Sequence, residues 1–255
     1  MKKTLVMTAA LLALTASLAA AAGGGLNLSW NDCGASGDQD HFFACNTNTT
    51  NNLLPGHTFV ASYVAPCCVD SANGTAAVIS LRTSGAVLPD WWRFAVTPCN
   101  RSTSLAENYN TSLLPGGCLD YWGQQTGGAA TGGRSYTIPD PGLGAPSARL
   151  NLACAIPTTV AGPIAEGTEV YMASVKISNQ KTVGLGRCLG CDESACIVLN
   201  SIKITQNQRS TGGTKFIGNP ANRNWITWRG GLANCGDPVT PARNTTWGSV
   251  KALYR

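Results

Sequence analysis

The segment "ARLNLACAIP", residues 148–157, carries the clearest structural signal in the chain. Leu150, Leu152, Cys154 and Ile156 occupy alternate positions, so they lie on one face if the segment is extended. Alternation with a period of two is typical of a β-strand that buries one face. We therefore expect a strand here, with Cys154 pointing into the core, where a disulfide would tie the strand to its neighbours.

Five further segments also resemble strands. The chain contains 29 glycines and 13 prolines, which favour many turns over long helices. Between the turns lie short runs that are candidate strands. These runs are residues 26–30, 57–64, 75–82, 168–178 and 195–205.

Two of these runs have an alternating pattern of their own. In residues 168–178, the positions opposite Met172, Ser174 and Lys176 form an apolar face: Tyr171, Ala173, Val175 and Ile177. In residues 195–205, four apolar positions share a face that is interrupted by Asn200: Cys196, Val198, Ile202 and Ile204. Each pattern predicts a strand with one buried face.

Residues 97–147 have a different composition. They are crowded with Gly, Pro, Ser and Thr and show no sustained period. We expect a long excursion with at most short strands, held in place by Cys99 and Cys118. Because structureless loops of this length are unusual inside a compact domain, the segment should either carry function or connect two sheets.

A short helix is expected at the end of the chain, in "NTTWGSVKALYR" (244–255). Asn244 or Thr245 can cap it, and Trp247 and Val250 are spaced to share one face. A helix this short is marginal in water on its own, so we expect it to pack against the sheet.

The N-terminus has the three parts of a secretory signal peptide. Lys2 and Lys3 form a basic region, residues 5–18 are apolar, and Ala20 and Ala22 fit the small-x-small cleavage pattern. The pattern predicts a bacterial Sec-type signal over residues 1–22. The mature chain, residues 23–255, is then expected to form a single β-rich domain that is secreted or periplasmic.

Charge and hydropathy argue against two classes of partner. Removal of residues 1–22 takes away two lysines, so the net charge falls from +5 to +3. Only 12% of the residues are charged and there is no Lys/Arg run, so nucleic-acid binding is not expected. No later stretch approaches the roughly 20 apolar residues of a spanning helix, so no membrane span is expected either.

All 11 cysteines lie in the mature chain. In an exported protein neighbouring thiols tend to oxidise, which predicts up to five disulfides and one thiol left over. Each bridge contributes about 2–4 kcal/mol, mainly by restricting the unfolded chain. Connectivity is open, but we expect a Cys33–Cys45 bridge. Separate partners are expected for the adjacent Cys67 and Cys68, because a bridge between neighbours forces an unusual backbone geometry.

Three cysteines fall close together in "GRCLGCDESACIVLNSIKI" (186–204). A zinc site would need a fourth ligand such as Cys235, and a thioredoxin-type pair should begin a helix, whereas a β-branched run follows here. We therefore expect structural disulfides that fix this Gly-rich loop to the start of a strand, and no metal or cofactor. The disulfide candidates are Cys33, Cys45, Cys99, Cys118, Cys188, Cys191, Cys196 and Cys154, the last as a candidate partner for one of the cluster.

An aspartate precedes two aromatic residues at two places, "PDWWRF" (89–94) and "LDYWGQ" (119–124). Aromatic faces beside carboxylates suit sugars, and two acids about 5–10 Å apart can form a glycosidase pair. The alternative, which the high aromatic content of secreted β-domain cores favours, is that the rings fill the core and the aspartates cap turns. The speculative ligand-binding residues are Asp90, Trp91, Trp92, Asp120, Tyr121 and Trp122. We assign Trp225 and Trp228 to packing.

The chain has two histidines, His41 and His57. His41 lies close to Asp32, Asp38 and Asp40, which could supply oxygen ligands to Ca²⁺, but the spacing matches no EF-hand loop and a polar loop is favoured. His57 is expected to be exposed at the start of a strand. Neither histidine has an evident serine or cysteine partner, so we predict no catalytic residue.

The chain resembles a group of uncharacterised exported bacterial proteins. The resemblance rests on "LNLSWNDC", "FACNTN", "LPDWW", "CLGC…ACIVLNSI" and "TTWGSVKALYR", and it spans nearly the whole mature chain. The adjacent cysteines at 67–68 depart from that pattern. The resemblance implies no activity, cofactor or catalytic residue.

These observations predict an all-β fold, a disulfide-stapled β-sandwich or jelly-roll-like domain with long loops and a short C-terminal helix. The expected function is that of an exported non-catalytic structural or surface-interaction protein, with a glycan or another extracellular protein as its partner. One alternative is a carbohydrate-binding module that uses the paired Asp-aromatic motifs. A weaker alternative is a secreted glycosidase with Asp90 and Asp120 as its acids.

Overall fold

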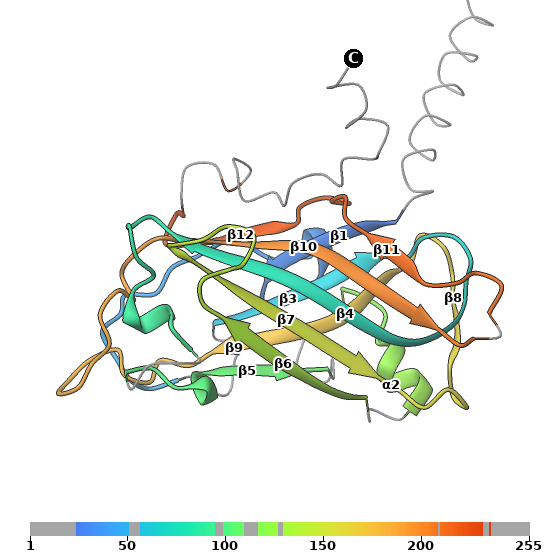
Figure 1. Cartoon of the computed structure of the whole chain (residues 1–255), viewed down its shortest axis with the longest axis horizontal. Helices are drawn as coiled ribbons and strands as arrows, with labels where there is room; N and C mark the ends of the chain where they lie inside the picture. The colour runs from blue at the N-terminus through green and yellow to red at the C-terminus, as the bar shows by residue number, and fades with distance from the viewer. Residues whose placement is uncertain are drawn as a thin grey trace, which may run out of the picture.

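A computed structural model describes residues 24–50, 57–94, 99–109, 117–126, 130–208, 210–231 and 235. The predicted signal peptide and the predicted C-terminal helix lie outside the described residues. Within these residues the chain forms two β-sheets and one short α-helix, α2 (Tyr121–Thr126) (Figure 1). None of the described helices is long and apolar enough to cross a membrane.

The smaller sheet has four antiparallel strands in the order β1-β3-β9-β5. Their bounds are Gly25–Trp30, His57–Val64, Glu169–Ile177 and Leu105–Asn108. In the pairing of β3 with β9, Ala61 faces Ala173 but Ser62 faces Tyr171, so Met172 is an extra residue. Met172 and Ser174 are buried too, so β9 buries both faces over most of its length.

The larger sheet has the strand order β2-β12-β10-β4-β7-β6, with β11 beside β10 and β8 beside β4. Along that order, the bounds are Asp40–His41, Trp225–Trp228, Ala195–Gln206, Val69–Thr83, Ser147–Ala155 and Thr131–Thr137. The two short additions are Lys215–Ile217 (β11) and Gly162–Ile164 (β8). All pairs are antiparallel except β2 with β12.

The all-β prediction is confirmed, and each of the six predicted strands is present, as β1, β3, β4, β7, β9 and β10. In β7, Leu150, Leu152 and Cys154 are buried on one face as expected. Residues 97–147 contain only short elements in their described part, but they include the unpredicted α2 and β6. β6 was missed because it is a Gly-containing edge strand without apolar alternation, and β7 alone specifies its pairing.

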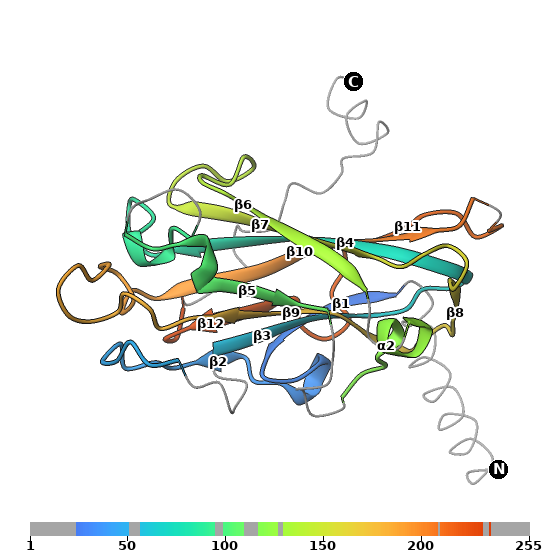
Figure 2. The ribbon, with the colours of Figure 1, turned by 90° about the horizontal axis from the view of Figure 1, so that it is seen from below.

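The two sheets pack face to face around one hydrophobic core. Both sheets contribute to it, the smaller sheet for example with Leu26 of β1 and the larger sheet with Trp228 of β12. Figure 2 shows β6, β7 and β4 on one side of the molecule and β3 on the other. Along one side the sheets are joined by backbone contacts, because the amide groups of Leu26 and Leu28 donate to the carbonyls of Asn219 and Arg223. This side of the sandwich is therefore closed by a continuous run of hydrogen bonds.

The other side, between the edge strands β5 and β6, is bridged by side chains. Arg134 of β6 forms an ion pair with Glu107 of β5 and donates to the carbonyl of Ser102. The hydroxyl of Tyr109 donates to the carbonyl of Gly133. These contacts hold the two edges together without merging the sheets.

The predicted buried face of β10 is wrong for its first half. Against β4, Leu199 pairs with Ile79 and Ser201 with Val78, so Asn200 is the extra residue of a β-bulge. A single extra residue reverses which side chains point inward. As a result Ile197, Leu199, Ile202 and Ile204 enter the main core, while Cys196 and Val198 belong to a separate small cluster with Cys235.

Five disulfides cross-link the described residues, and their pairing differs from several expectations. The bridges are Cys33–Cys118, Cys45–Cys191, Cys67–Cys68, Cys99–Cys188 and Cys196–Cys235. The predicted Cys33–Cys45 bridge is therefore wrong, as are the separate partners expected for Cys67 and Cys68. Cys154 points into the core as predicted, but it is a free thiol rather than a bridging cysteine.

Candidate functional site

Loops from four parts of the chain gather at one end of the sandwich, on the left of Figure 1. They comprise residues 42–50, 84–94, 99–104 and 178–194, and we call this region the loop end. Strand pairing brings them together, because Thr83 faces Ala195 and both His57 and Leu105 face Ile177. Two disulfides, Cys45–Cys191 and Cys99–Cys188, tie three of these loops to one another.

Hydrogen bonds reinforce the loop end. Asn48 accepts through Oδ1 from the amides of Thr182 and Val183 and donates through Nδ2 to the carbonyl of Val183. The amide of Trp91 donates to the carbonyl of Leu189, and the side chain of Trp91 donates to the hydroxyl of Thr182. The 178–194 loop is thus fixed on two sides although it carries no regular secondary structure.

Large apolar side chains are exposed on this rigid framework. Leu185 is fully exposed, and Phe42, Val87 and Leu189 are each about two thirds exposed, at 68%, 66% and 64%. The guanidinium of Arg229 lies 4.6 Å from the centre of the Phe42 ring. Of the six large apolar side chains that are exposed in the described part of the chain, these four lie at the loop end.

Beneath the loops, Trp228 is the centre of an aromatic cluster. Its ring contacts six others at centroid distances of 5.2–6.0 Å: Trp30, His41, Phe43, His57, Trp91 and Trp92. The side chain is fully buried, and its Nε1 donates to the carbonyl of Cys191 at 2.8 Å. The cluster therefore connects β12 directly to the disulfide Cys45–Cys191.

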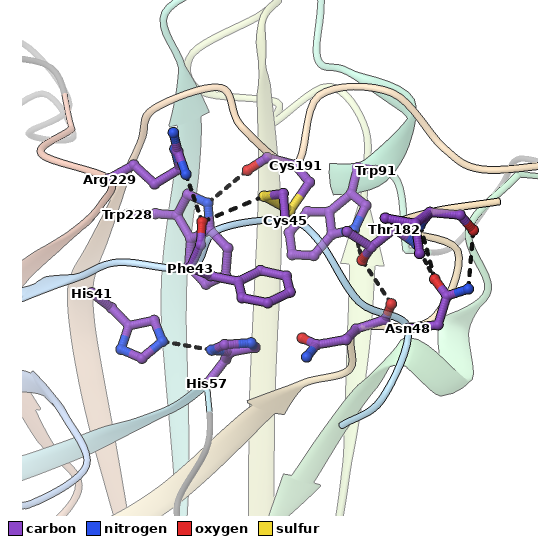
Figure 3. Close-up of a disulfide and its surroundings, with 12 residues drawn as sticks. His41, Phe43, Cys45, Asn48, His57, Trp91, Thr182, Cys191, Trp228 and Arg229 are labelled. Atoms are coloured by element: carbon purple, nitrogen blue, oxygen red, sulfur yellow. Dashed lines mark hydrogen bonds between the residues drawn. A yellow bond between two sulfur atoms is a disulfide. The ribbon is translucent and has the colours of Figure 1, made fainter. Parts of the chain in front are cut away.

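The two histidines of the chain meet at the edge of this cluster (Figure 3). His41 ends β2 and His57 begins β3, and His41 Nε2 lies 2.5 Å from His57 Nδ1. The His57 ring packs against Phe43 and the His41 ring against Trp30, with centroid separations of 4.5 and 4.8 Å. The expectation of an exposed His57 is wrong, because the 42–50 loop and Trp228 cover it.

Burial keeps both imidazoles neutral at physiological pH. The pKa of His57 is lowered to about 4, mainly by desolvation and also by nearby His41 and Lys176, while a hydrogen bond with Asn179 acts in the opposite direction. Desolvation also lowers the pKa of His41, although Asp40 and Asp38 act in the opposite direction. In the neutral pair one facing nitrogen donates its hydrogen to the other, which leaves unprotonated nitrogens within the site.

The carboxylates near His41 serve local turns rather than a calcium site. Asp40 Oδ1 accepts from the hydroxyl of Thr227 and from the amide of Gly230, and Asp32 Oδ1 accepts from the amide of Cys33. Across the described ranges, no group of three or more His, Cys, Asp or Glu side chains is placed to hold a metal ion.

The aromatic residues of the first Asp-aromatic motif lie in the core. Trp91 and Trp92 are fully buried and pack edge to face, with a centroid distance of 4.9 Å. Asp90 is exposed and pairs with Arg93 at 3.5 Å on the short η2 helix (Asp90–Trp92). Neither tryptophan presents a ring face on which a sugar could stack.

The second motif is placed in the same way at the opposite end of the molecule. Tyr121 and Trp122 are buried, and the Tyr121 hydroxyl donates to the carbonyl of Ala72. Asp120 precedes α2 and accepts from the amide of Gly123, which is the role of a helix cap. Both motifs therefore fit the packing interpretation, and the structure does not support a carbohydrate platform formed by these residues.

The two aspartates are too far apart to act as a glycosidase pair. Leu119, next to Asp120, pairs with Val170 at the start of β9, whereas Trp91, next to Asp90, contacts Thr182 beyond its end. At about 3.3 Å per residue, the length of β9 between these points separates them by roughly 20 Å. A glycosidase pair needs about 5–10 Å, so this alternative is excluded.

A half-open cavity of about 350 Å³ lies between the edges of β5 and β6. Its polar lining includes Arg134 and Glu107, and its apolar lining includes Phe94, Leu105 and Tyr136. Because Arg134 is already paired with Glu107, the cavity offers no free cation to an anionic ligand. The cavity therefore lies at the seam between the two sheets.

The free thiol of Cys154 is chemically quiet. Burial is the largest effect on it and raises its pKa to about 11, while a hydrogen bond with Thr75 acts in the opposite direction. Since the thiolate is the reactive form, the thiol is protonated at physiological pH and shielded from reagents. The odd cysteine is thus a small apolar core residue.

The histidine pair is the feature that sequence reasoning missed. The two residues are 16 positions apart and on different strands, so no local spacing indicates that they touch. The available signal was their position, since His41 immediately follows an acidic turn and His57 opens a strongly apolar strand. Only the packing of the two sheets brings those two points together, because β2 and β3 belong to different sheets.

Comparisons with known proteins identify no family for this chain. No family model and no curated protein matches the sequence. Among solved structures, the sixth cohesin of Acetivibrio cellulolyticus scaffoldin B, solved in complex with a Cel5 dockerin, is similar over 81% of this chain and 97% of its own, with 8% identity and a TM-score of 0.32. A cohesin module of a family 33 glycoside hydrolase from Clostridium perfringens is similar over 78% of this chain and 98% of its own length, with 7% identity and a TM-score of 0.29. Likenesses this weak carry no function over to this chain.

Proposed function

We propose that the protein is exported and acts by binding another extracellular protein through the loop end. The observation that carries this proposal is the exposure of Phe42, Val87, Leu185 and Leu189 at the loop end. Phe42, Leu185 and Leu189 lie on loops that are tied by disulfides, and Val87 lies on the 84–94 loop beside them. Exposed apolar groups on a soluble protein mark interaction surfaces when they gather in one region.

The rigidity of these loops supports binding in a second way. A loop that must become ordered on association loses part of the interaction energy to conformational entropy, and preorganisation removes that cost. At the loop end this order is already present, through Cys45–Cys191, Cys99–Cys188 and the Asn48 hydrogen bonds. The loops can therefore present Leu185 and Leu189 to a partner in one conformation.

The five disulfides support an oxidising, extracytoplasmic location. Export through the predicted signal peptide is tested by N-terminal sequencing of the protein recovered from outside the cytoplasm, with Gly23 as the expected first residue. A chain that keeps residues 1–22 would contradict that part of the proposal.

Binding through the loop end is tested by photo-crosslinking. A photoreactive phenylalanine analogue is placed at position 185 or, as the control, at position 216, where the native Phe216 is also largely exposed, at 74%. Position 216 belongs to β11, which lies away from the loop end (Figure 1). The labelled mature protein is applied to intact cells of the exporting strain. We expect a saturable cross-link to one protein from position 185 and none from position 216.

Competition gives the test its specificity. Unlabelled mature protein should abolish the cross-link, and so should the variant Val160→Ser/Phe216→Ser, which removes two exposed apolar side chains elsewhere. The variant Leu185→Ser/Leu189→Ser should fail to compete. Equal cross-linking from both positions, equal competition by both variants, or turnover of a substrate by the purified protein in a broad hydrolase screen would overturn the proposal.

A further inference from the structure

We propose that His41 and His57 together bind a transition-metal cation, with Cu²⁺ as the preferred ion. Imidazole nitrogens are common ligands of copper and zinc, and Cu²⁺ binds nitrogen donors most tightly among the divalent first-row metals. The histidine pair lies below the loop end, and metal binding by this pair does not depend on the proposed protein partner.

The geometry of the pair suits a tetragonal ion. His41 Nε2 and His57 Nδ1 face each other at 2.5 Å. Two neighbouring ligands of a tetragonal Cu²⁺ ion, each about 2.0 Å from the metal and at right angles, are about 2.8 Å apart. To accept the ion, the two nitrogens must move apart by a few tenths of an ångström, and both rings must turn so that the nitrogens point toward the metal instead of toward each other. The wider ligand angle of a tetrahedral Zn²⁺ site would require a larger movement.

The surrounding structure holds both rings in place. His41 is fixed by the pairing of β2 with β12, where the amide of Arg229 donates to its carbonyl, and His57 is fixed by the pairing of β3 with β9. Aromatic rings restrict the imidazoles from the side, with Trp30 against His41 and Phe43 against His57. Such restraint means that little conformational entropy is lost when a metal binds.

A third polar group is available beside the pair. The side chain of Asn179 is almost fully buried, at 4% exposure. A side-chain hydrogen bond to His57 favours the protonated ring, so the amide oxygen of Asn179 faces the imidazole. Apart from His57, this oxygen has no hydrogen-bond partner among the described residues, so it can serve a metal ion or its bound water.

Charge and solvent access also permit binding. Asp38 and Asp40 act on His41 from the β2 side, whereas Lys176 of β9 is the cation that faces His57. Both side chains are partly exposed, and water can fill the remaining coordination positions.

The experiment is a Cu²⁺ titration of the tag-free mature protein with intact disulfides, followed by electron paramagnetic resonance. The terminal amine is blocked beforehand, because it can also ligate copper. Since the chain contains only two histidines, any imidazole signal belongs to His41 or His57. We expect one Cu²⁺ per chain with two coordinated imidazoles, and quenching of tryptophan fluorescence from the nearby Trp30 and Trp228.

Substitutions complete the test. His41→Gln and His57→Gln should each weaken Cu²⁺ binding at least tenfold and leave at most one imidazole in the spectrum. The control Lys176→Gln removes a charge facing the site but no nitrogen donor of the pair, so it should bind Cu²⁺ at least as tightly as the wild type. Unchanged affinity in both histidine variants would overturn the proposal.

The wild-type spectrum decides the matter even if a histidine variant fails to fold. Imidazole coordination is read directly from the electron spin echo modulation of the unmodified protein. A wild-type spectrum without an imidazole contribution overturns the proposal, and a contribution from two imidazoles supports it.

Discussion

At the scale of single residues, the environment of each side chain decides its role more than its type does. Trp91 and Trp92 follow an aspartate in a pattern that suits sugar binding, yet both are buried and contact Trp228. His57 occupies a position expected to be exposed, yet aromatic rings cover it and lower its pKa. Which side chains form the candidate site therefore depends on which residues pack around Trp228 in the folded chain.

We expect the protein to lose about 2 kcal/mol of unfolding free energy as the pH falls from 7 to 4. The pKa of His57 is about 4 in the folded protein but near 6.5 in the unfolded chain, so between these values the unfolded chain binds the extra proton. One pKa unit corresponds to about 1.4 kcal/mol, and partial solvent exposure reduces the full value to about 2 kcal/mol. His41 acts in the same direction, because its pKa is also lowered.

Urea unfolding at pH 7, 5.5 and 4 measures this effect. The variant His57→Gln should keep only the weaker dependence due to His41, whose pKa is also lowered by burial. An identical loss of stability in the wild type and in the variant would show that His57 is not responsible.

At the scale of secondary structure, the bulge at Asn200 determines which side chains of β10 point into the core. It lets Ile197 and Leu199 point inward on one side of the bulge and Ile202 and Ile204 on the other. Asn200 also donates to the hydroxyl of Ser80, which donates to the buried carboxylate of Asp140. A polar residue in an apolar strand therefore marks a change of register rather than a break in the strand.

Deletion of Asn200 should destabilise the protein by at least about 4 kcal/mol. Without the bulge, either Ile197 and Leu199 or Ile202 and Ile204 must face away from the core, and each exposed side chain costs about 2 kcal/mol. Asn200→Ala keeps the extra residue and loses mainly the bond to Ser80, so it should cost about 1 kcal/mol. Denaturant unfolding of the two variants compares the costs, and a deletion no worse than the alanine variant would contradict the bulge assignment.

At the scale of the whole molecule, the sandwich is closed by different means on its different sides. Backbone hydrogen bonds join the sheets beside β1, and the Arg134–Glu107 pair bridges the side with β5 and β6. At the loop end, where no strand crosses, the bridges Cys45–Cys191 and Cys99–Cys188 replace strand pairing. Two of the five disulfides thus lie where the hydrogen-bond network of the sheets ends.

The five disulfides should contribute very unequally to stability. Cys45–Cys191 spans 146 residues, so its loss releases a large loop in the unfolded chain, whereas Cys67–Cys68 joins neighbours and restricts almost nothing. We expect Cys45→Ser/Cys191→Ser to cost about 3–5 kcal/mol and Cys67→Ser/Cys68→Ser less than about 1 kcal/mol. Thermal unfolding of the two variants checks this, and equal losses would contradict it.

Much of the fold could be predicted because the evidence for it is local. The alternation in residues 148–157 and in the five other runs depends only on neighbouring residues, and all six became strands. The inward direction of Cys154 follows from the same period and is confirmed. Edge strands such as β6 lack this alternation, because pairing with one apolar neighbour strand, here β7, is enough to specify their position in the sheet.

The site could not be predicted in the same way. The two Asp-aromatic motifs are identical in pattern but lie at opposite ends of the molecule, and the histidine contact joins two strands that do not pair with each other. Disulfide pairing was equally open, since eleven cysteines allow many connectivities and only proximity selects one.

By itself, the sequence determined the all-β class, the positions of the six principal strands and an odd number of cysteines in a chain rich in disulfides. The tertiary structure alone decided the disulfide partners, the face of β10 that is buried, the burial of the aromatic rings of both Asp-aromatic motifs and the meeting of His41 with His57. The physical reason is that strand formation depends on neighbouring residues. Contacts at the loop end depend instead on which strand ends the two sheets place side by side.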